Sequence, residues 1–493
     1  MKKISLRGAS WDSMFLAFSK VLTLLFSIVS AKILSNGLTL QEYGTYSQAN
    51  LVYSIGSSLI LLGLVDAMNY FFNRRGEGID DELRARIVNT VFFCEIAVGV
   101  VLAGFIVFGR DLLAAYFSND AVKVLLPVVA LLPMLANIVY FYQVLYVAVG
   151  KAKSMALFNL CLTLTRIVTI YFAVYWLKNL ILIYLVMLAM DFVQVLIFHF
   201  ELHKKGVHIH PLRISPRHIK PIFAYGLPMG VYAITSTLSR DLDKLVIGRL
   251  GGTEELAIYT NCSKILPLEV FVSSFAVVLI PYIYRRVTEG RQKESAELFS
   301  SYLKVGYYSV WTLGTMVLVA PATIISFLYA DAYVTGLPVF ILYIFDSMLR
   351  FASVHLILTA AGKSKRIMAY SIASLGINLV LNIFFYYIWG MIGPAIATLI
   401  AAFIYAFLIL NSTIKIIQAK WSDIFNWREV LWFVTTLAVI WAMSFVLNQL
   451  LCTWGLHRYL SMILSMAVFG LSVLALHYKK IFGVLKQINS FKL

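Results

Sequence analysis

Ionisable side chains occur inside stretches of this sequence that are otherwise apolar enough to cross a membrane. The densest group lies between residues 220 and 252, where Arg240, Asp241, Asp243 and Lys244 fall close together. A charged side chain at the centre of a membrane helix costs roughly 2.5–3.5 kcal/mol on insertion scales, so such residues are kept where they face partners or a wet interior. We therefore expect this segment to line a central cavity.

Helical spacing refines this expectation. Arg240 and Lys244 are four residues apart, and Arg240 and Asp243 are three apart, so these three side chains share one helix face. On the same wheel Asp241 turns partly away. The segment opens with the sequence Gly226, Leu227 and Pro228, where we expect a break because proline removes a helix hydrogen bond.

Further charges inside apolar stretches complete the candidate site. The cations expected to bind an anionic substrate in the cavity are Arg240, Lys244, Arg166, Arg350, Lys20 and Lys264. The acids expected to couple an ion or to pair with these cations are Glu269, Asp243, Asp66 and Asp191, and Glu95 also lies within an apolar stretch.

Some of these charges have a structural alternative. Arg166 and Asp191 lie at similar depth on consecutive antiparallel helices and could simply pair with each other. Asp346 and Arg350 have i,i+4 spacing and could neutralise one another. Arg240 is the hardest to explain in this way, and it faces either a substrate or Glu269.

No enzymatic constellation is visible. The three histidines His203, His208 and His210 fall in one polar loop and are interpreted as solvated. The glycines at 248–252 end an apolar helix and lack the lysine arrangement of a phosphate-binding loop. The four cysteines form no CxxC pair, which argues against disulfides and structural zinc. We expect no enzyme activity, no cofactor and no metal.

The elements that position these residues are membrane helices. Hydrophobic residues make up 61% of the chain and charged residues 13%, and apolar runs of roughly 20 residues recur along it. The fold class is therefore an all-α polytopic membrane protein with about fourteen transmembrane helices. Their expected positions are near 12–34, 43–72, 87–108, 121–148, 155–176, 179–200, 219–248, 254–283, 303–328, 338–361, 366–388, 393–416, 429–449 and 457–477.

Lysine and arginine are concentrated in alternate loops and at both ends of the chain. The positive-inside rule then places the N- and C-termini in the cytoplasm, and it accounts for the net charge of +17 without nucleic-acid binding. The basic start and apolar run of residues 1–30 resemble a signal peptide, but Lys20 interrupts the run. We expect a retained first helix.

An internal repeat organises the chain. Gly150-Lys151-Ala152-Lys153 recurs as Gly362-Lys363-Ser364-Lys365, and in the same register Lys32 corresponds to Lys244. Six helices per repeat preserve orientation, so two six-helix lobes are expected to surround the central cavity and to enclose the substrate path. The expected domains are an N-terminal lobe at 1–212, a C-terminal lobe at 213–420 and two additional helices with a basic tail at 421–493.

Three segments resemble one family. The run from Arg240 to Arg249 followed by residues 255–259, the run from Ala31 to Leu34 followed by Glu42 to Tyr46, and Gly390 to Ala397 are similar to motifs of Wzx-type polysaccharide biosynthesis proteins. These O-antigen flippases belong to the multidrug/oligosaccharidyl-lipid/polysaccharide exporter superfamily. Pro394 departs from the usual alanine of the third motif. The resemblance covers most of residues 10–420.

The resemblance implies a function. The substrate that it implies is an undecaprenyl-diphosphate-linked oligosaccharide, a repeat unit of O-antigen, lipopolysaccharide or another surface polysaccharide. Alternating access moves it from the cytoplasmic to the outer leaflet of the bacterial plasma (inner) membrane. The expected partners are this lipid-linked substrate, membrane lipids, a coupling H⁺ or Na⁺ and other polysaccharide assembly proteins.

Two alternatives stay open. The first is a cation-coupled drug or metabolite exporter of the same superfamily, in which an acid is the coupling site. The second is a membrane glycan polymerase or glycosyltransferase, which usually needs a large outer loop, and every outer loop expected here is short.

Overall fold

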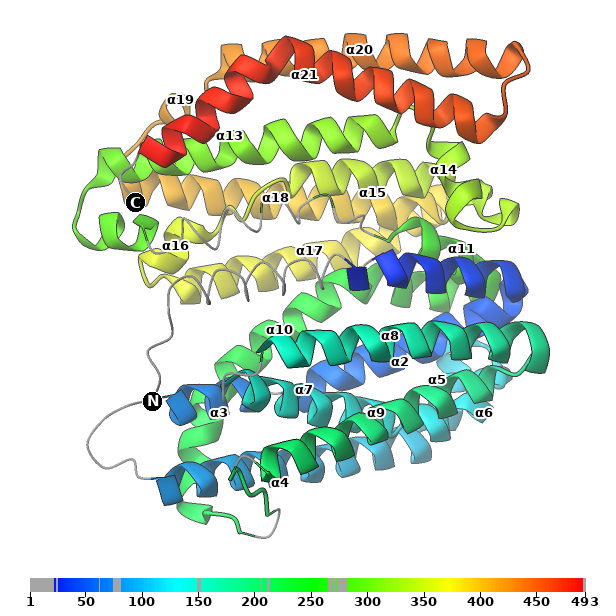
Figure 1. Ribbon diagram of the computed structural model, residues 1–493, viewed down its shortest axis with the longest axis vertical. Helices are drawn as coiled ribbons and strands as arrows, with labels where there is room; N and C mark the ends of the chain where they lie inside the picture. Colours follow the sequence, from blue (N-terminus) through cyan, green and yellow to red (C-terminus); the bar gives the residue numbers. More distant parts are fainter. Residues whose placement is uncertain are drawn as a thin grey trace. The chain divides into compact units, whose positions relative to one another are not determined.

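The computed structural model describes residues 22–490 with gaps at residues 24, 62, 74–80, 149–151, 205, 211–212, 265–267, 269–271 and 273–281. Every regular element in these residues is a helix (Figure 1). Contacts divide the chain into two compact units, Met1–Ala257 and Ile258–Leu493.

Ten helices in the described part are long and apolar enough to cross a membrane, or eleven if the bent pair Gln292–Val317 and Pro321–Leu328 is one span. The chain is therefore an all-helical, multi-pass membrane protein, as the composition predicts. Three of the expected spans, 12–34, 43–72 and 254–283, include residues outside the described part. The expected span 219–248 does form a long helix, but its content of charged and polar residues keeps it out of the ten.

The first unit begins with helical residues 25–37. It continues with α2 (Leu40–Leu61), α3 (Leu64–Asn73), α4 (Asp81–Phe108), α5 (Arg110–Phe117), α6 (Asp120–Val129), α7 (Leu132–Ala148), α8 (Ala152–Phe172), the π-helical turn η1 (Ala173–Leu177), α9 (Leu180–His203), α10 (Pro216–Leu250) and most of α11 (Gly252–Cys262). Asn119 starts α6 by accepting a hydrogen bond from the Ala121 N–H, and Asn179 starts α9 in the same way through Ile181.

An apolar cluster forms the core of the first unit. Side chains of α3, α4, α7 and α9 meet there, with Met68, Val91, Phe141 and Leu202 fully or almost fully buried. The rings of Phe92 and Phe141 lie 5.3 Å apart, which fixes α4 against α7.

The helix α10 does not break where the sequence predicts. It continues from Pro216 to Leu250 with Pro228 inside it. Proline removes one hydrogen bond but does not force a helix to end when neighbouring helices pack around it. Instead, the segment that packs against α10 is interrupted at Gly63, between α2 and α3. Gly63 has a φ of 68°, and a β-carbon there would lie 2.1 Å from the Gly226 carbonyl oxygen.

The second unit consists of α13 (Gln292–Val317), α14 (Pro321–Leu328), the 3₁₀ turn η2 (Asp331–Gly336), α15 (Leu337–Leu349), α16 (Leu356–Ala360), α17 (Ser364–Trp389), α18 (Ile392–Ile417), α19 (Trp421–Ile424), α20 (Trp427–Thr453) and α21 (Arg458–Ser490). Between α13 and α14 the chain bends by 80°. Pro321 lies in the first turn of α14, where its missing N–H has no helical partner to lose.

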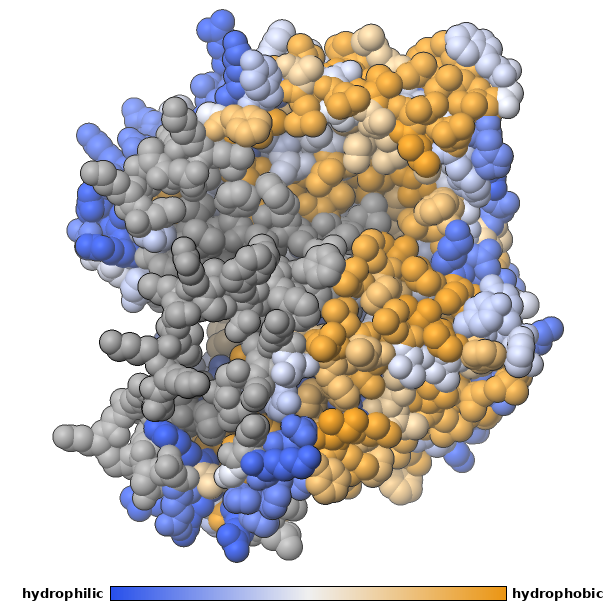
Figure 2. Space-filling model, in the orientation of Figure 1, coloured by the Kyte–Doolittle hydropathy of each residue, from blue (hydrophilic) through white to orange (hydrophobic). Residues whose placement is uncertain are grey.

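The helices of the second unit pack in consecutive pairs. The helices α17 and α18 lie side by side, as do α20 and α21, and α13 lies beside α21 (Figure 1). Figure 2 shows apolar side chains over the sides of α20 and α21 and hydrophilic residues at their ends, as expected of helices that cross a lipid bilayer.

Candidate functional site

The charged helix α10 packs antiparallel along α2, and three close contacts between residues 44–63 and residues 226–253 fix the register of the two segments. One end is the approach of Gly63 to Gly226 described above. In the middle the Ser54 hydroxyl of α2 donates a 2.8 Å hydrogen bond to the Asp241 carboxylate. At the far end a β-carbon on Gly44 would lie 2.0 Å from the Thr253 carbonyl oxygen, so only glycine allows the chains to come this close.

Lys244 and Asp241 form an ion pair within α10. The Lys244 ammonium lies 2.9 Å from the Asp241 carboxylate and also donates to the Arg240 carbonyl oxygen at 2.7 Å. Both side chains are about one-sixth exposed. The expectation that Asp241 turns partly away from the face that carries Lys244 is wrong. Its i,i+3 spacing from Lys244, together with Ser54 on the adjacent helix, draws the carboxylate into a buried network.

Arg240 differs from these neighbours. Its side chain is exposed, and its guanidinium donates one long hydrogen bond, at 3.3 Å, to the Thr237 hydroxyl one turn earlier. No carboxylate of the described residues lies within ion-pair distance of it. Glu269, the acid that the sequence offers as its partner, lies outside the described residues, as does Lys20.

Arg249, at the end of α10, has a structural role. Its guanidinium donates to the carbonyl oxygens of Ala115 and Tyr116, both at 3.0 Å, and lies 5.9 Å from the centre of the Tyr116 ring. A cation at the last carbonyls of a helix is favourable, so Arg249 caps α5. This contact gives a physical reason for the arginine in the motif that follows Lys244.

Arg166 of α8 and Asp191 of α9 are brought together. Their ion pair is 2.8 Å long, with Asp191 buried and the arginine side chain 37% exposed. One turn along α9, Gln194 donates to Asn159 of α8 at 3.0 Å, so a polar layer joins the two helices. Asn159 and Gln194 carry no charge, and nothing in their spacing distinguishes them from other polar residues of membrane helices.

In the second unit, Arg350 and Asp346 pair at 2.8 Å, with Asp346 buried at the end of α15. Lys264 donates to the Asn261 side chain at 2.8 Å, and its ammonium lies 5.6 Å from the centre of the Tyr329 ring. These cations are therefore held by neighbours from their own unit.

The remaining acids have different environments. Asp243 is almost fully buried on α10, whereas Asp66 is half-buried in the first turn of α3. Glu95 of α4 is fully buried beside the apolar cluster, and neither of its carboxylate oxygens has a hydrogen-bond partner in the described residues. The described residues contain no group of three or more His, Cys, Asp or Glu side chains that could hold a metal ion.

Residues 33–338, more than half of the chain, match the model of the polysaccharide biosynthesis protein family. The chain belongs to this family. The matched region contains α2 to α11 and therefore the whole charged segment of α10. No curated protein matches the chain.

Solved structures show the fold. The lipid II flippase MurJ in an inward closed conformation is 14% identical, with 96% of this chain and 99% of that chain covered and a TM-score of 0.73. An inward-facing multidrug resistance MATE family transporter of the MOP superfamily is 14% identical, with 80% and 94% covered and a TM-score of 0.68. The MATE multidrug transporter DinF-BH is 14% identical, with 85% and 98% covered and a TM-score of 0.56. The chain therefore has the fold of the MOP superfamily.

Proposed function

We propose that this protein is a flippase for an oligosaccharide linked to undecaprenyl diphosphate. Its family is one of polysaccharide biosynthesis, and among the solved structures of the same fold is a flippase of another lipid-linked precursor, lipid II. The repeat unit of an O-antigen or of another surface polysaccharide is the proposed cargo. The chain itself carries out no bond-making chemistry.

The exposed guanidinium of Arg240 is the observation that carries the proposal. The cations Lys244 and Arg166 of the same unit are neutralised by Asp241 and Asp191, whereas Arg240 has no carboxylate partner among the described residues. A guanidinium without an acidic partner on a membrane helix costs free energy unless an anion binds to it. A planar guanidinium can donate two parallel hydrogen bonds to two oxygens of one phosphate. A polyprenyl diphosphate must carry such a phosphate group through hydrocarbon.

The proposed mechanism is alternating access between two six-helix lobes, residues 1–212 and 213–420, with residues 421–493 as two additional helices and a tail. This architecture has about fourteen transmembrane helices. The alternating basic loops favour cytoplasmic termini in a bacterial inner membrane. Coupling to H⁺ or Na⁺ and contact with other polysaccharide assembly proteins are part of the same proposal.

The test compares three arginine variants in a strain that lacks the chromosomal gene. Arg240→Gln is expected to reach the membrane at the wild-type level and to leave lipid-linked repeat units trapped on the cytoplasmic leaflet. Arg240→Lys, which keeps the charge but loses the fork, is expected to restore part of the surface glycan. Arg217→Gln is the matched control, since Arg217 is exposed near the start of the same helix.

Wild-type surface glycan from Arg240→Gln would contradict the role of Arg240. Normal surface glycan in the deletion strain, together with drug resistance conferred by the wild-type gene, would favour the exporter instead. Fold alone does not separate these functions, because flippase and MATE structures are equally distant in sequence from this chain.

A further inference from the structure

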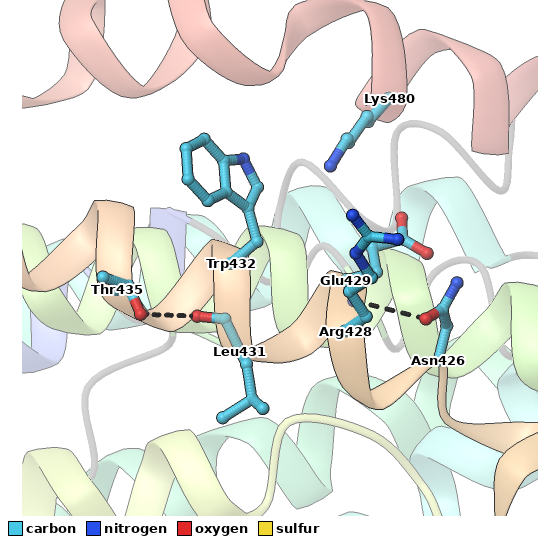
Figure 3. A pocket seen from close by; sticks show the side chains of 7 residues that line it. All are labelled: Asn426, Arg428, Glu429, Leu431, Trp432, Thr435 and Lys480. Atoms are coloured by element: carbon cyan, nitrogen blue, oxygen red, sulfur yellow. Dashed lines mark hydrogen bonds between the residues drawn. The ribbon is translucent and has the colours of Figure 1, made fainter.

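A pocket of about 730 Å³ opens where α20 begins and α21 approaches its end. Its lining consists of Asn426, Arg428, Glu429, Leu431, Trp432, Thr435 and Lys480. Figure 3 shows Trp432 rising from α20 toward α21, and Lys480 extending from α21 toward α20, so that both helices contribute a wall. All seven residues belong to the second unit.

The position of the pocket along α20 corresponds to the membrane–water interface. At about 1.5 Å per residue, the 27 residues of this helix measure about 40 Å, longer than a hydrocarbon core of about 30 Å. The excess of about 10 Å, divided between the two ends, places about the first turn of α20, which contains Arg428 and Glu429, among lipid headgroups. The indoles of Trp427 and Trp432 are 51% and 58% exposed near this end of the helix, as is typical of tryptophans that anchor a span at headgroup depth.

The charges in the pocket leave an excess of positive charge. The Glu429 carboxylate is already satisfied, because the Lys304 ammonium at 3.0 Å and the Tyr308 hydroxyl at 2.8 Å both donate to it. Arg428 and Lys480 are exposed, and no carboxylate of the described residues forms an ion pair with either. Two cations thus face an open volume from two different helices.

Contacts next to the pocket join its two helices. One turn before Lys480, His477 is buried and shares a 2.8 Å hydrogen bond with the Thr436 hydroxyl of α20. The His477 ring packs edge-on against Phe433, with 5.0 Å between ring centres. These contacts hold α20 against α21 within about two turns of Arg428 and one turn of Lys480, so the fold sets the backbone positions that carry the two cations.

We propose that this pocket binds the headgroup of an anionic glycerophospholipid from the surrounding bilayer. Arg428 and Lys480 contact the phosphate, and Trp432 packs on the glycerol and the upper acyl carbons. Basic pockets between membrane helices at a charged bilayer surface select anionic headgroups in this way. The pocket opens at headgroup depth, where bulk phospholipid is the abundant phosphate, and the proposal does not depend on the transported cargo.

The experiment uses the purified full chain in detergent, titrated with dioleoyl-phosphatidylglycerol or dioleoyl-phosphatidylcholine. Retained lipid is counted by native mass spectrometry, and the thermal unfolding midpoint is measured in the same samples. Wild type is expected to retain phosphatidylglycerol, with a higher midpoint, and not phosphatidylcholine. The double variant Arg428→Gln/Lys480→Gln is expected to weaken retention of phosphatidylglycerol at least tenfold.

The matched control is Lys479→Gln/Lys415→Gln. It removes the same charge from exposed residues that do not line the pocket, and it is expected to retain phosphatidylglycerol like wild type. Trp432→Ala tests the apolar wall and is expected to weaken retention while leaving both cations in place.

Three results would overturn the proposal. Unchanged retention by Arg428→Gln/Lys480→Gln would remove the two cations from the site. An equal loss in the control would mean that diffuse surface charge attracts the lipid. Retention of undecaprenyl diphosphate, offered as a separate probe, with no retention of phosphatidylglycerol would assign the pocket to a polyprenyl phosphate.

Discussion

Replacing Lys244 with methionine leaves the Asp241 carboxylate buried on α10 without its cation. The two side chains lie 2.9 Å apart and are 15% and 16% exposed, so water compensates little for the lost partner. Removing one member of a buried pair typically costs about 3–5 kcal/mol, since the other charge stays desolvated. We therefore expect Lys244→Met to be one of the most destabilising single changes on this helix.

Substituting Asp241 as well distinguishes the loss of the ion pair from the loss of side-chain packing. Asp241→Asn alone removes the carboxylate 2.9 Å from the Lys244 ammonium and leaves Asp243 as its acidic neighbour, so it is expected to destabilise the protein less than Lys244→Met. The double variant Lys244→Met/Asp241→Asn removes both members of the ion pair, and the asparagine still accepts from Ser54. It is therefore expected to recover most of the loss, because residues in contact have non-additive effects.

The assay is thermal unfolding of the purified protein, followed by fluorescence-detected size-exclusion chromatography after heating. Lys415→Met, an exposed lysine at the end of α18, controls for the loss of a positive charge. A midpoint of Lys244→Met equal to that of Lys415→Met would refute the buried pair. A double variant no better than the sum of the two single changes would refute the coupling.

Two further stability changes follow from close packing and burial. Gly44→Ala is expected to lower the unfolding midpoint, because its β-carbon would collide with the Thr253 carbonyl. Gly104→Ala is the control, since its β-carbon would meet open space, and it is expected to leave the midpoint unchanged. Equal midpoints of the two variants would contradict the contact. Glu95→Met is expected to raise stability by about 1–3 kcal/mol, because it replaces a fully buried carboxyl that has no hydrogen-bond partner among the described residues by an apolar group of similar size. A large loss of stability in the same melting assay would reveal a partner.

Much of the fold follows from residue patterns. Long apolar runs predict the membrane helices, since hydrocarbon leaves a spanning backbone few alternatives to the helix. The pairs Arg166–Asp191 and Asp346–Arg350 also follow, because helix spacing and antiparallel order bring their charges together. The family is recognisable from the charged segment, and its match covers that segment.

Other features depend on contacts that a helical wheel does not contain. The i,i+3 spacing of Asp241 and Lys244 permits their ion pair, but the hydrogen bond that Asp241 accepts from Ser54 of α2, distant in sequence, cannot be predicted from a helical wheel. Pro228 predicts a break in α10, yet the neighbouring backbone at Gly63 breaks instead. The pocket between α20 and α21 joins residues about fifty positions apart, none of which differs by itself from an ordinary interfacial side chain.

The central claim is that the chain moves a diphosphate-linked lipid past Arg240. Its most direct test is the purified protein reconstituted in phosphatidylethanolamine and phosphatidylglycerol vesicles that carry a fluorescent undecaprenyl-diphosphate oligosaccharide. The fraction of oligosaccharide that an added glycosidase can reach reports movement between leaflets. We predict that wild type exposes the inner pool with time and that Arg240→Gln, folded and inserted equally well, does not. Equal exposure by wild type and Arg240→Gln, or none by wild type under any ion gradient, would contradict the claim.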